Sequence, residues 1–86
     1  MPFVTRLSDE SKTALRVILD RGVVSGADLL SLTGMAPGTL IAAIDPLLKS
    51  ELVGSSGNVY QPGDIKRAFF NLRPSARDLA EGYLNL

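Results

Sequence analysis

The sequence predicts one small, mainly helical domain with a small β-hairpin, spanning residues 1–86. Three observations indicate this class. Apolar residues recur at helical spacing in several segments, and glycine or proline separates those segments. A short stretch of β-forming residues at about 51–62 surrounds a Gly/Ser/Asn cluster. With 45% hydrophobic and 21% charged residues, the chain has the composition of a globular protein that can build a single core.

Start and stop signals predict the first two helices. The Ser8 hydroxyl can cap free backbone N–H groups, and Gly22 suits the left-handed position that ends a helix. Ser25 opens the second helix, because Asp28 follows three residues later in an approximate capping box. Gly34 then breaks the helical pattern.

A third helix is expected from Pro37, which fits a first helical turn because its missing N–H costs nothing there. The core-facing residues form one apolar stripe: Leu40, Ala43, Ile44 and Leu47. The opposite face, toward solvent or a partner, carries Gly38, Ala42, Asp45, Pro46 and Lys49. Pro46 leaves the Ala42 carbonyl without its usual donor, so a bend is expected there.

The β-forming residues predict one hairpin and one very short additional strand. Val23-Val24 forms the short strand between the first two helices. Leu52-Val53 and Val59-Tyr60 are expected to pair with each other across a turn at Gly57-Asn58.

The C-terminal segment, about 64–85, is predicted to be helical. Within it, Ile65, Ala68, Phe69 and Leu72 follow the spacing i, i+3, i+4, i+7, which favours a helix over 65–72. The alternative is a strand, since Ala68, Phe70 and Leu72 also alternate, and a long loop from Ser55 to Lys66 would then precede it. In either case Pro74 starts the final helix.

The order helix, short strand, helix, tight turn, helix, hairpin, helix is that of a winged helix-turn-helix domain, with a three-helix core, a wing and here an extra C-terminal helix. The segment DLLSLTGMAPGTLIAAIDPLLKSELV resembles this superfamily in its Leu-x-x-Thr-Gly turn, its Pro-x-Thr helix opening and its closing Leu-Val. Gly-Asn-Val-Tyr is similar to the wing of IclR-like regulators, and NLRPSARDLAEGYL to a helix opening of MarR and PadR regulators, although Arg73 replaces their capping Thr. The resemblance places the helix-turn-helix at about 25–50 and the wing at about 51–62.

This resemblance implies a transcriptional regulator that binds double-stranded DNA through its third helix and wing, most simply as a dimer. The residues expected to face DNA are Ser25, Ala36, Gly38, Thr39, Ala42, Lys49 and Asn58. The basic pair Lys66-Arg67 is added as a candidate phosphate contact. As in the related regulators, the C-terminal helix is expected to form the homodimer interface, with Leu79, Tyr83 and Leu84.

The side chains on the third helix are chemically weak for reading bases, which keeps a second function open. Bidentate contacts to guanine need Arg or Lys, and contacts to adenine need Asn or Gln. No basic residue occurs between Gly22 and Leu48, and the net charge is zero. The alternative function is therefore a winged helix that docks a protein partner on a small apolar face: Ala36, Gly38, Ile41, Ala42 and Pro46.

The composition argues against several other classes. The chain has no histidine and no cysteine, so it lacks the commonest general base, the commonest metal ligand and any thiolate. We therefore expect no enzymatic activity, no metal site and no cofactor. No stretch approaches the roughly 20 apolar residues of a membrane span, and no signal peptide is evident, so a cytoplasmic protein is expected.

Overall fold

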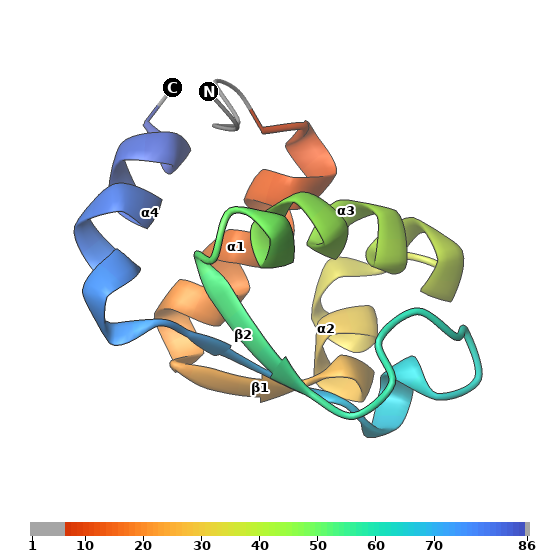
Figure 1. Ribbon diagram of the computed structural model, residues 1–86. Coiled ribbons are helices and arrows are strands. Elements are labelled where there is room, and N and C mark those ends of the chain that lie inside the picture. Colours follow the sequence, from red (N-terminus) through yellow and green to blue (C-terminus); the bar gives the residue numbers. More distant parts are fainter. Residues whose placement is uncertain (1–6, 86) are drawn as a thin grey trace.

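The computed structural model describes residues 7–85 as a mainly helical domain with a small antiparallel sheet (Figure 1). In chain order the elements are α1 Asp9–Arg21, β1 Val23–Ser25, α2 Gly26–Thr33, α3 Pro37–Lys49, β2 Val53–Ser56, the 3-10 turn η1 Ile65–Arg67, β3 Phe69–Leu72, the 3-10 turn η2 Pro74–Ala76 and α4 Arg77–Leu84. Helix α1 packs against α2, α3, α4 and β3, and thereby holds the domain together.

The helix caps agree with the sequence signals. Ser8 Oγ accepts a hydrogen bond from the Ser11 N–H at 3.1 Å, and Ser25 Oγ accepts one from the Asp28 N–H at 3.1 Å. Gly22 and Gly34 end α1 and α2 with φ values of 79° and 72°, which only glycine adopts without strain. The predicted boundaries of the first two helices are therefore confirmed.

The three-stranded sheet has the order β1-β3-β2, with both neighbours antiparallel to β3. On one side Val24 is opposite Phe70, and on the other Ser55 is opposite Phe70. Strands β1 and β2 do not pair with each other, so β3, the last strand in the sequence, is the central strand that connects them. It also leaves β1 and β2 as the two edges.

The segment 65–72 is where the favoured sequence interpretation is wrong. It contains the single 3-10 turn η1 and then strand β3, which is the alternative interpretation. The helical spacing of its apolar residues is genuine, but Phe70 is fully buried while Phe69 is 53% exposed, as the alternation of a strand requires. Two partner strands offer more backbone hydrogen bonds to 69–72 than an isolated short helix would, and this decides the outcome.

The predicted hairpin is also wrong in its second strand. Strand β2 pairs with β3, while Val59 and Tyr60 belong to the loop between them and form no strand. Val59 is nevertheless buried, so its side chain packs into the core although the residue belongs to a loop and not to the sheet. The wing-like segment is therefore a long loop rather than the tight turn at Gly57-Asn58 that the local sequence suggested.

Helices α2 and α3 meet at an angle of 110° across the short turn 34–36. Thr33 Oγ accepts a hydrogen bond from the Met35 N–H at 3.3 Å and donates one to the Leu29 carbonyl at 2.6 Å, so its side chain fixes the turn. Helix α3 then begins at Pro37, as predicted, with its apolar stripe buried against α1. None of the described helices is by itself long and apolar enough to cross a membrane; only α2 and α3 together reach that length, as this bent pair.

A buried serine joins α1 to α3. Ser11 is fully buried, and its Oγ donates a hydrogen bond of 2.6 Å to the Ala43 carbonyl oxygen. The Ala43 carbonyl is next to the Ala42 carbonyl, which receives no helical hydrogen bond because Pro46 has no N–H. Ser11 therefore stabilises the helix pair at the point where the regular ladder of α3 is interrupted.

Replacing Ser11 with alanine should lower the free energy of unfolding by about 1–2 kcal/mol, because it removes a buried hydrogen bond and leaves a carbonyl with one partner fewer. Urea unfolding followed by circular dichroism measures the loss. Ser31→Ala is the matched control, since Ser31 is an exposed helical serine and alanine has the higher helix propensity. An equal response of the two variants would contradict this role of Ser11.

Candidate nucleic-acid interface

The outward face of α3 is small and uncharged over its first two turns. Ala36 is the N-cap residue, and Gly38, Thr39 and Ala42 are exposed, as expected for residues that would face DNA. Together with Ser8 and Glu10 of the α1 start, the last three line a shallow hollow of about 410 Å³. The hollow therefore brings an acidic side chain next to the candidate DNA-facing residues, which the linear sequence did not reveal.

The lysine at the end of α3 is neutralised by its own helix. Lys49 Nζ lies 2.9 Å from Asp45 Oδ2, one turn earlier. The hydrogen bond to Asp45 and then its negative charge raise the pKa of Lys49 above its ordinary value, so the lysine stays charged. Because the pair has no net charge, α3 presents little attraction to phosphates by itself.

Ser25 lies at the start of α2, where a helix N-terminus can bind a phosphate. Its hydroxyl already accepts from the Asp28 N–H, and the Gly26 N–H donates to the Ala68 carbonyl at 2.8 Å. Two of the N–H groups at this terminus are therefore occupied within the domain. The exposed Asp28 adds a negative charge to the same turn.

The loop between β2 and β3 carries the other candidate DNA contacts. Asn58 is exposed, but its side chain supports the loop: Oδ1 accepts from the Tyr60 N–H at 3.1 Å, and Nδ2 donates to Asp64 Oδ2 at 3.5 Å. Lys66 and Arg67 are both exposed on η1, which packs against α2. Among residues 7–85, neither is in an ion pair. This pair is consequently the site of free positive charge on the loop.

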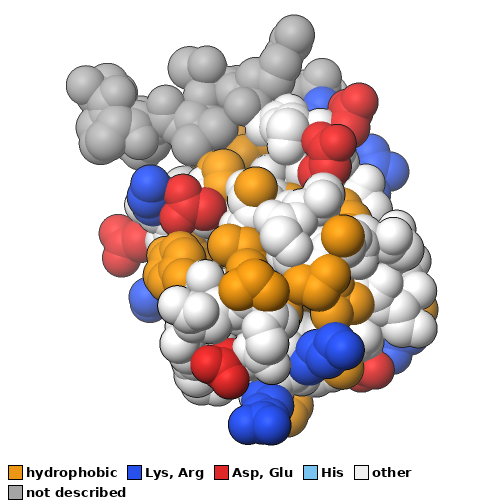
Figure 2. Space-filling model, turned by 90° about the vertical axis from the view of Figure 1, so that its right-hand side faces the viewer, with side chains coloured by type: hydrophobic (Ala, Val, Ile, Leu, Met, Phe, Trp, Pro, Cys, Tyr) orange, Lys and Arg blue, Asp and Glu red, His pale blue; other side chains and the backbone are white. Residues whose placement is uncertain are grey.

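Hydrophobic side chains gather in a band across the face formed by α2, the start of α3 and the loop 57–64, with Lys and Arg side chains near its lower edge (Figure 2). The large exposed hydrophobic residues of these elements are Leu32, 50% exposed, and Tyr60, 56% exposed. This part of the surface therefore combines apolar and basic character.

The three residues expected at a dimer interface have different surroundings. Tyr83 is 9% exposed and belongs to the core of its own chain, and Leu84 packs partly against the same core. Leu79 is 52% exposed on α4 and is thus the residue of the three that is available to a second copy.

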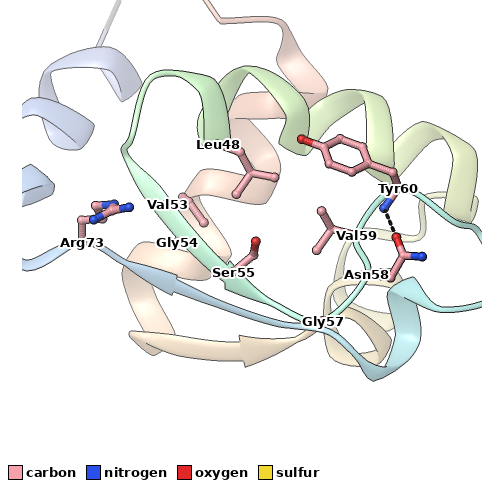
Figure 3. Close-up of a pocket in the computed structure, with 9 residues that line it drawn as sticks. All are labelled: Leu48, Val53, Gly54, Ser55, Gly57, Asn58, Val59, Tyr60 and Arg73. Carbon is pink, nitrogen blue, oxygen red and sulfur yellow. Dashed lines mark hydrogen bonds between the residues drawn. The ribbon is translucent and has the colours of Figure 1, made fainter.

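A second hollow lies between α3, β2 and the loop 57–60 (Figure 3). Its volume is about 400 Å³, and Arg73 and Tyr60 line it together with the loop residue Asn58. The sequence interpretation assigned no binding role to Arg73 or Tyr60. Arg73 follows β3, and its N–H donates to the Leu52 carbonyl before β2, so its place at this hollow depends on the strand pairing that local periodicity could not predict.

Comparisons with protein families, with characterised proteins and with solved structures give no significant match. Among the described residues no cluster of three or more acidic side chains is placed to hold a metal ion.

Proposed function

We propose that this chain is a winged helix-turn-helix domain that binds double-stranded DNA as part of a transcriptional regulator. The observation that carries the proposal is the 110° angle between α2 and α3 across a three-residue turn, since DNA-binding helix-turn-helix units have angles of about 90–120°. The strand order β1-β3-β2 next to this unit, with a long loop between β2 and β3, supports the proposal, because the loop would take the place of the wing.

In this function α3 enters the major groove with small residues, and the loop supplies the phosphate contacts. Gly38 and Ala42 permit a close approach of the backbone, and Thr39 offers a hydroxyl to a base edge or phosphate. The free charges of Lys66 and Arg67 bind the DNA backbone. Because Glu10 lies beside the same helix face and repels phosphates, we expect weak binding. Because Gly38, Thr39 and Ala42 offer no bidentate contact to a base, we expect low sequence selectivity.

A mixed-sequence duplex titrated at low salt should bind, and the affinity should fall steeply as salt rises. The double variant Lys66→Gln/Arg67→Gln should reduce the slope of log affinity against log salt by about 2, close to one per lost phosphate contact. Fluorescence anisotropy at several salt concentrations measures this slope.

The charge-matched control is Arg16→Gln/Arg77→Gln, which removes two cations from the α1–α4 side of the domain, where Arg16 lines a hollow with Glu81 and Arg77 lies 4.0 Å from Glu81. Its slope should equal that of the unmodified protein. No binding at low salt would argue for protein docking on α3 instead, and equal slope changes in both double variants would contradict the assigned phosphate contacts of Lys66 and Arg67. Amide shifts that spare Gly38, Thr39 and Ala42 would exclude entry of α3 into the groove.

A further inference from the structure

The hollow beside β2 has the construction of a peptide groove. Its floor is apolar, because Val53 and Val59 are 2% and 6% exposed and Leu48 is half-buried. Its rim is polar, with Ser55 on β2, Tyr60 on the loop and Arg73 after β3 (Figure 3). A volume of about 400 Å³ lies within the range of about 300–1,000 Å³ for ligand pockets.

One wall of this groove is the free edge of β2. The Arg73 N–H donates to the Leu52 carbonyl at 3.1 Å, so this opposite pair is hydrogen-bonded. Antiparallel pairs alternate, and the next hydrogen-bonded pair joins Gly54 to Asn71. The N–H and C=O groups of Val53 and Ser55 therefore point away from β3, toward the groove. Within residues 7–85, no turn or cap bond uses them.

The groove has a positive charge without a counter-charge. Arg73 is the one charged residue among those lining it. Its guanidinium forms no ion pair within the described part of the chain, where the ion pairs are Lys49–Asp45 and Arg77–Glu81.

We propose that this groove binds an extended, acidic peptide segment of a partner protein, which adds to β2 as a fourth strand and places a carboxylate on Arg73. Strand addition supplies affinity through the backbone groups of Val53 and Ser55, while alternate side chains of the peptide enter the apolar floor. The carboxylate selects acidic peptides, because arginine binds it through paired N–H groups. The site goes beyond DNA binding and does not depend on it.

The test uses a fluorescent hexapeptide that alternates valine and threonine and carries one glutamate, with the full chain as receptor. A glutamine version of the peptide is the charge control. Two further versions carry N-methyl groups on the odd or on the even residues, which removes N–H donors along one edge of the peptide strand only. Anisotropy gives the affinities, and amide shifts locate the site.

The glutamate peptide should bind with shifts at Val53, Ser55, Tyr60 and Arg73, and one N-methyl pattern should abolish binding while the other does not. Arg73→Gln should weaken the glutamate peptide by about 3- to 10-fold and leave the glutamine peptide unchanged. Arg77→Gln is the control, since Arg77 does not line the groove.

Equal binding of the glutamate and glutamine peptides would overturn the role of Arg73, and equal effects of the two N-methyl patterns would overturn strand addition. No peptide binding at low salt would overturn the proposal, and duplex DNA shifting the same four residues would then make the groove a phosphate site. Loss of DNA binding alone would overturn the proposed function and leave the peptide site standing.

Discussion

Replacing Phe70 with alanine is expected to lower the free energy of unfolding by about 3–5 kcal/mol. Phe70 is fully buried at the centre of β3, where it is opposite Val24 on one side and Ser55 on the other. Truncation therefore leaves a cavity between the sheet and the helices and removes the largest apolar side chain of the core. For a domain of this size the loss is a large part of the total stability, about 5–15 kcal/mol.

Phe69→Ala is the matched control for this prediction. Phe69 is the neighbouring residue of the same strand, but it is 53% exposed on the opposite face of the sheet. Its replacement should cost about 1 kcal/mol or less, because most of its surface is already in water. Chemical unfolding of both variants gives the two values. Similar losses would mean that 69–72 is a helix or an unpaired segment rather than the central strand.

Gly26→Ala should destabilise the domain by about 3 kcal/mol, at the upper end of overpacking effects. Gly26 is buried at the start of α2, and a Cβ on it would overlap the carbonyl oxygen of Ile65. Its N–H also donates to the Ala68 carbonyl at 2.8 Å. An alanine must therefore separate α2 from η1 and disturb the entry into β3.

The control is Gly82→Ala, which places the same methyl group on an exposed helical glycine with open space around it. This variant should be stabilised by about 0.5–1 kcal/mol, because alanine loses less backbone entropy than glycine in a helix. Thermal unfolding followed by circular dichroism compares the two. A neutral Gly26→Ala would show that α2 and η1 are not in close contact.

The helical part of the fold was predictable because its signals are local. Ser8, Ser25 and Pro37 mark helix starts, and Gly22 and Gly34 mark helix ends, all within a few residues of the elements they limit. The caps act through hydrogen bonds and backbone angles of adjacent residues, so the sequence contains the whole cause.

The sheet was not predictable in the same way, because the residues that pair in it are far apart in the sequence. Residues 65–72 fit a helical pattern and an alternating pattern at once. Phe70 lies in a strand because it pairs with Val24 on one side and with Ser55 on the other. The β-propensity of Val59 predicted a strand position, whereas Val59 lies in a loop and its side chain is buried in the core. Local β-propensity indicates a half-buried position and does not name the strand that will pair with it.

In the candidate interface, too, the local features were predictable from the sequence and the contacts between distant segments were not. The absence of basic residues from α3 before Lys49, its last residue, was evident from the sequence, and the outward residues Gly38, Thr39 and Ala42 are indeed exposed. The approach of Glu10 to that face, and of Arg73 to the groove beside β2, depends on packing between segments far apart in the chain. Such neighbours follow only from the tertiary arrangement.

The central place of β3 has a consequence for synthesis on the ribosome. Strand β1 is synthesised about 45 residues before its partner, since Val24 is opposite Phe70. Strand β2 likewise has no pairing partner until β3 has been synthesised. The helices can form as they emerge, whereas the sheet requires contacts of large sequence separation, which cost loop-closure entropy and slow folding. In a nascent chain that ends before Phe69, β1 and β2 are therefore both unpaired strands, and the addition of β3 completes both pairings in one step.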